Sequence, residues 1–139
     1  MVPLAGEEIL NPCQYRLAIP DSTHPVRAVW TIFERGPDSI HFYEDPAVRQ
    51  FAHDSRLALV LAIHRRSKER GDMIVDLAKG AGRALVAALD QFAESEHHPE
   101  LKKAPLIFLG WSGAASLVGR MAGFRPDRYL AGIEYAPGQ

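Results

Sequence analysis

Two continuous apolar runs constrain this chain most strongly. They are "LALVLAIH" at 57–64 and "PLIFLG" at 105–110. A strand that is exposed on one face alternates apolar and polar residues, so continuous runs predict strands that are covered on both faces, as in a parallel sheet. Between them, "GRALVAALDQFAESEHH" (82–98) repeats its apolar residues at helical spacing, which predicts an amphipathic helix. A strand–helix–strand order of this kind is typical of a crossover between parallel strands.

The rest of the chain continues this alternation of strands and helices. Asp45 and Pro46 are suited to the N-cap and the first position of a helix. The further elements that we predict are strands at 13–19, 26–33 and 128–136, helices at 45–55 and 113–124, and a loop at 34–39. The pattern predicts an α/β fold with a mostly parallel sheet and flanking helices. A length of 139 residues fits a single domain that spans residues 1–139.

Composition and charge exclude several classes of function. The formal net charge is −1, without the basic excess that a nucleic-acid partner requires. No apolar run approaches the roughly 20 residues that span a bilayer, and the N-terminus does not resemble a signal peptide. We therefore expect a cytoplasmic protein. Cys13 is the single cysteine, and there are no paired Cys/His spacings, so we expect no internal disulfide, no metal and no cofactor.

A serine lies at the corner that follows the second apolar run. The stretch is Gly110-Trp111-Ser112-Gly113, between a predicted strand and a predicted helix. The two glycines permit a sharp turn, which would leave the serine hydroxyl outside the carboxyl end of the strand, where α/β sheets bind ligands. The backbone N–H of Gly113 would begin the helix without an intrahelical acceptor, so it could donate to an oxyanion.

This corner resembles the nucleophile elbow, G-x-S-x-G, of the α/β-hydrolase superfamily, with Ala114 in place of the last glycine. The preceding elements follow the superfamily's order, because "VRAVWTIFERG", "LALVLAIH", "GRALVAALDQF" and "LIFLG" occupy the corresponding positions. The resemblance covers most of the chain but only the N-terminal portion of a typical hydrolase. It implies an α/β-hydrolase-like but truncated fold. It also implies an esterase- or lipase-like serine hydrolase that acts on carboxylic esters through an acyl-enzyme at Ser112.

The resemblance also implies an oxyanion hole. One donor would be the N–H of Gly113, and the second would come from the loop after "WTIF". That loop reads Glu34-Arg35-Gly36-Pro37, without the family's His-Gly pair. Proline has no N–H to donate, so the second donor would be Arg35 or Gly36.

The catalytic base and acid have no obvious counterparts. In this superfamily the order is serine, acid, histidine, yet all six histidines precede Ser112. Of the later carboxylates, Asp127 resembles a surface turn residue, and Glu134 falls inside the last predicted strand. We therefore expect the chain to be incomplete and inactive alone. His64, at the end of a predicted strand, is a loop or pocket-wall residue or an upstream base, and Trp111 packs at the elbow or lines the pocket.

A second hypothesis assigns no chemistry to the serine. Ser112 would then cap a helix after a glycine-containing turn, and the chain would be a non-catalytic α/β binding or interaction domain. A sheet that ends on "GIEYA" would expose an apolar edge, which is an aggregation hazard and also favours an incomplete chain. We therefore also expect self-association through a sheet edge.

Overall fold

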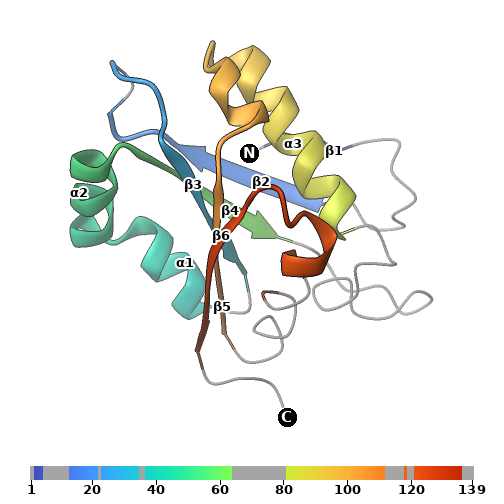
Figure 1. Ribbon diagram of the computed structural model, residues 1–139. Coiled ribbons are helices and arrows are strands. Elements are labelled where there is room, and N and C mark those ends of the chain that lie inside the picture. The colour runs from blue at the N-terminus through green and yellow to red at the C-terminus, as the bar shows by residue number, and fades with distance from the viewer. Residues whose placement is uncertain are drawn as a thin grey trace.

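A six-stranded sheet with helices on both faces forms the body of the molecule (Figure 1). The computed structural model describes residues 2–4, 13–21, 23–34, 37–63, 81–111, 118 and 121–135. The strands are β1 (Val2–Leu4), β2 (Cys13–Ala18), β3 (Ala28–Phe33), β4 (Leu57–Ile63), β5 (Leu106–Trp111) and β6 (Tyr129–Tyr135). Their order across the sheet is β1-β2-β4-β3-β5-β6.

Four neighbouring strands run in parallel. β4, β3, β5 and β6 pair in parallel, while β1 and β2 join the other edge in antiparallel orientation. The helices are α1 (Pro37–Glu44), α2 (Pro46–Ser55), α3 (Ala81–Ser95) and the 3₁₀ helix η2 (Pro99–Lys102), and residues 118 and 121–124 are also helical. The predicted α/β fold, with a mostly parallel sheet and flanking helices, is confirmed.

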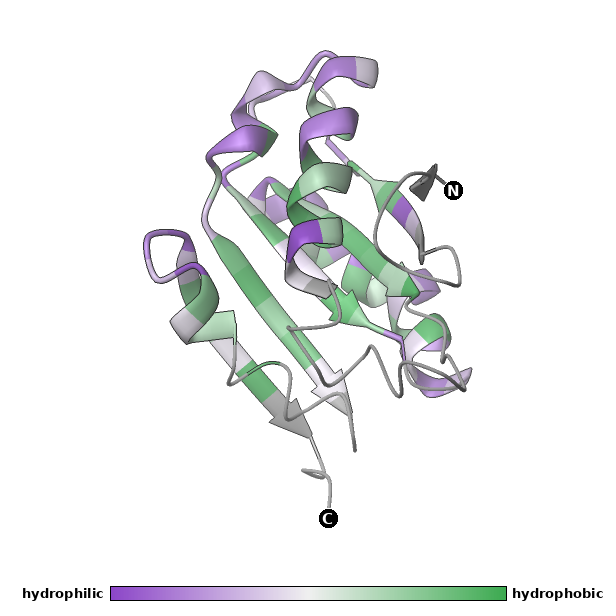
Figure 2. Ribbon diagram, turned by 90° about the vertical axis from the view of Figure 1, so that its right-hand side faces the viewer, coloured by the Kyte–Doolittle hydropathy of each residue, from purple (hydrophilic) through white to green (hydrophobic). Residues whose placement is uncertain are grey.

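Alternate residues of the central strands supply two separate cores. On β4, Ala58 and Val60 face the core that α3 covers, together with Leu85 and Leu89 of that helix. Leu59 faces the opposite core, beside α1 and α2. Every residue of β4 except the last is buried, which explains why its apolar run is continuous. Figure 2 shows the central strands as nearly unbroken hydrophobic stretches, while the helices carry hydrophilic residues on their outer surfaces.

The capping residues predicted for the second helix are confirmed. Asp45 is the N-cap of α2, its side chain accepts from the N–H groups of Ala47 (2.8 Å) and Val48 (3.2 Å), and Pro46 opens the helix. Arg56, in the left-handed conformation with φ 57°, ends it and leads directly into β4.

The prediction of a loop at 34–39 is wrong in its second half. α1 begins at Pro37 and includes Asp38 in its first turn. Proline is pre-organised for the first helical position, and an acidic side chain in the first turn interacts favourably with the positive end of the helix dipole. The same residues after a glycine are also typical of a turn, so the sequence pattern does not distinguish a turn from the start of a helix at this position.

Candidate active site

The carboxyl ends of the parallel strands meet along one edge of the sheet. The register aligns Ala62 of β4, Phe33 of β3, Gly110 of β5 and Glu134 of β6 in one row across it. The N–H of Glu34 donates to the carbonyl of Ala62 at 2.9 Å, so the pairing of β3 with β4 continues one residue beyond β3. This row defines what we call the carboxyl edge (Figure 1).

The carboxyl edge rests on well-packed strands. Phe33 is 1% exposed, and Ala62 and Gly110 are also buried. Phe33 stacks on Phe108 of β5, with ring centroids 5.7 Å apart and planes 4° from parallel. The Phe108 ring stacks in turn on Tyr129 of β6, at 5.6 Å. Three rings therefore tie together β3, β5 and β6, which are three of the four parallel strands that end at this edge.

Most of the predicted site residues lie outside the described residues. These are Ser112, Gly113, Arg35, Gly36 and His64. Trp111 is described as the last residue of β5, paired with Tyr135, but its side chain is not described. The structure thus defines the strands that lead to the predicted site.

The histidine–carboxylate pairs of the described ranges lie elsewhere, in segments that precede the parallel strands. His24 Nδ1 lies 2.9 Å from Asp21 Oδ2 before β3, and His53 Nδ1 lies 3.2 Å from Asp54 Oδ1 just before β4. His53 and Asp54 are adjacent in the sequence, so no helical or strand periodicity indicates their contact. Such pairs at the amino ends of the strands are structural and do not contribute to the carboxyl edge.

A third pair joins two distant segments. Glu100 Oε2 lies 2.7 Å from His98 Nδ1 and accepts from the N–H of Val26 at 2.8 Å. We call this arrangement the amino-edge clasp, because it holds the entry to β3 against η2. Burial raises the pKa of Glu100, but the hydrogen bonds from Val26 and His98 outweigh it, so the pKa lies below its ordinary value.

Asp127 is a surface turn residue, as predicted. It is exposed, and its carboxylate receives two hydrogen bonds from Arg125, at 3.0 and 2.9 Å, in the turn before β6. The hydrogen bond from Arg125 lowers the pKa of Asp127. Glu134 lies within β6, also as predicted. The structure therefore does not bring Asp127 to the carboxyl edge, since the turn precedes the strand.

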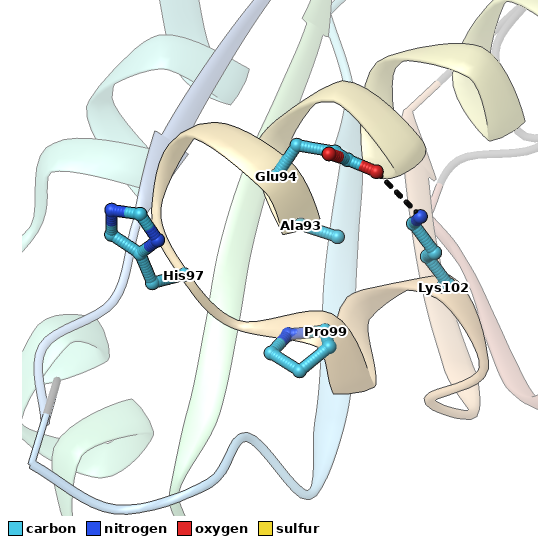
Figure 3. Close-up of a pocket in the computed structure, with 5 residues that line it drawn as sticks. All are labelled: Ala93, Glu94, His97, Pro99 and Lys102. Carbon is cyan, nitrogen blue, oxygen red and sulfur yellow. Dashed lines mark hydrogen bonds and ion pairs between the residues drawn. The ribbon is translucent and has the colours of Figure 1, made fainter.

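Two cavities of about 320 Å³ lie away from the carboxyl edge. One lies between the end of α3 and η2, and Figure 3 shows Glu94 and Lys102 joined across it by an ion pair of 2.7 Å. Both of these charges are exposed and satisfied by each other. The other cavity is apolar and is lined by Trp30, Phe42, Ala47, Val48 and Phe51.

Neither a metal centre nor a membrane span is found in the described part of the chain. None of its groups of three or more His, Cys, Asp and Glu side chains is arranged to hold a metal ion. The helices described are too short or too polar to cross a bilayer.

Similarity to known proteins is visible in the structure but not in the sequence. No protein-family model matches the chain, and no curated protein matches it in sequence. Solved structures match it with low identity. Acetyl xylan esterase from Aspergillus awamori has a TM-score of 0.68 and 11% identity over 98% of this chain and 51% of that chain.

Two further solved structures give the same picture. S-formylglutathione hydrolase (FrmB) from Staphylococcus aureus has a TM-score of 0.60 and 9% identity, and the match covers 92% of this chain and 52% of that one. The thermophilic carboxylesterase EstE1, cloned from a metagenomic library, has a TM-score of 0.59 and 17% identity, with coverage of 98% and 45%. The chain therefore has the fold of the α/β hydrolases and spans about half the length of the structures that it matches.

Proposed function

We propose that this chain is the nucleophile-bearing part of a serine hydrolase that acts on carboxylic esters. The observation that carries the proposal is the end of β5 at Trp111, because Ser112 follows it directly in the sequence. An esterase-type nucleophile needs this position, outside the carboxyl end of a buried parallel strand. Structures that share the fold include an acetyl xylan esterase and a carboxylesterase, which supports an ester substrate.

The register of β3 and β5 supports the proposed oxyanion hole. Phe33 pairs with Gly110, and in the sequence Arg35 and Ser112 each come two residues after this pair. Neighbouring strands lie about 4.8 Å apart. The short connection from β3 to α1 thus begins beside the nucleophile's strand, as donation from Arg35 or Gly36 requires. Together with the N–H of Gly113, this N–H would hold the oxyanion of the tetrahedral intermediate.

The same register argues against His64 as the base. Ala62 lies in the row of Phe33 and Gly110, but β3 separates β4 from β5. Two strand spacings amount to about 10 Å, so a histidine after β4 is better suited to a pocket wall. We propose that the base and the acid lie outside this chain, and that the chain alone turns over little or no ester.

A cysteine substitution tests the nucleophile without requiring a histidine. A thiolate is intrinsically nucleophilic, and a helix N-terminus lowers the pKa of a thiol. In a Cys13→Ser background, Ser112→Cys should be acylated by p-nitrophenyl acetate at least tenfold faster than Ser95→Cys. Ser95 is exposed at the opposite, carboxyl end of α3, so it provides the matched control. Intact-mass measurement of both variants follows the acyl-enzyme.

The result separates the two functional hypotheses. Equal acylation of the two thiols would contradict the elbow proposal and favour the non-catalytic binding domain. A large Ser112-dependent turnover by the unmodified chain would instead show that a base lies within these residues.

Two further parts of the prediction also remain proposals. A cytoplasmic location rests on the sequence alone. Self-association through a sheet edge likewise rests on the apolar sequence "GIEYA" alone.

A further inference from the structure

We draw no further inference here: the strongest candidate, the apolar cavity that Trp30, Phe42 and Phe51 line between β3 and the helices α1 and α2, carries none, because nothing in the structure shows what covers it and the chain spans only about half the length of the structures that it matches.

Discussion

Removal of the Phe108 ring should destabilise the chain strongly, because this ring is the centre of the three-ring stack. Phe108 is 1% exposed and contacts Phe33 and Tyr129, at centroid distances of 5.7 and 5.6 Å. Phe→Ala at a buried site costs about 3–5 kcal/mol, since transfer free energy is lost and a cavity remains. We expect a loss of about 4 kcal/mol in the free energy of unfolding for Phe108→Ala, out of a typical total of about 5–15 kcal/mol.

The corresponding shift in the midpoint of thermal unfolding is large. At about 2.1 cal/mol/K per residue, the unfolding entropy of 139 residues is about 290 cal/mol/K. A loss of 4 kcal/mol therefore lowers Tm by about 14 °C. Urea unfolding followed by circular dichroism measures the free energy, and a thermal scan measures Tm. Phe108→Leu retains most of the buried volume and should lose about 1–2 kcal/mol, mainly the stacking of the rings.

An exposed aromatic residue provides the control. Phe51 is 54% exposed, and its ring meets Trp30 edge-on at 6.0 Å, so Phe51→Ala should cost less than about 1 kcal/mol. If Phe108→Ala lost less than about 1.5 kcal/mol, or no more than Phe51→Ala, the stack would not be part of a close-packed core. The stack would then not hold the strands of the carboxyl edge in place.

Three further outcomes are expected. Asp45→Ala removes the N-cap of α2 and should lower the free energy of unfolding by about 1 kcal/mol in urea, whereas Asp45→Asn should retain most of it. The hydrogen bond from Thr23 is the largest cause that lowers the pKa of Asp21 to about 2, so NMR titration should give a midpoint near 2, and Thr23→Val should raise it toward the ordinary range. Because this pKa is lowered by folding, Asp21 contributes stability above its unfolded pKa and loses it as the pH falls through about 2. Glu100→Ala removes the amino-edge clasp and leaves His98 and a buried N–H without their acceptor, so urea unfolding at neutral pH should show a loss of about 1–3 kcal/mol. This difference in the free energy of unfolding should become smaller in acid, because protonation of Glu100 weakens the clasp in the unmodified chain. A difference that did not change with pH would contradict the assignment.

The sequence predicted the elements that local patterns encode. The continuous apolar runs became β4 and β5, because strands covered on both faces need apolar residues at every position. The N-cap at Asp45 was predictable because its hydrogen bonds reach only two and three residues ahead. α1 was concealed because Pro37 after a glycine suits a turn as well as a helix start.

Contacts between distant residues were not predictable from the sequence. Nothing local indicates that β3 lies between β4 and β5, or that Glu100 accepts from an N–H that is 74 residues away. The pairing of strands depends on tertiary packing, which a pattern of period two or 3.6 does not report. The serine corner is a local motif, so the sequence identifies it. Its second oxyanion donor and its base would come from other segments, and these stay predictions.

The row of strand ends gives the strongest constraint on the chemistry of the carboxyl edge. β3 lies directly beside β5, so the segment that follows Phe33 leaves a strand adjacent to the one that precedes Ser112, whereas the segment that follows Ala62 leaves a strand one spacing farther away. Donation from a nearby backbone N–H requires only this adjacency, whereas a base must bring a side-chain nitrogen within hydrogen-bond reach of the hydroxyl. This adjacency is the support for our proposal of an oxyanion hole built within the chain and a base supplied from outside it. Acylation of Ser112→Cys would depend on the oxyanion hole but would not require the base. For this reason it tests the elbow more directly than ester turnover does.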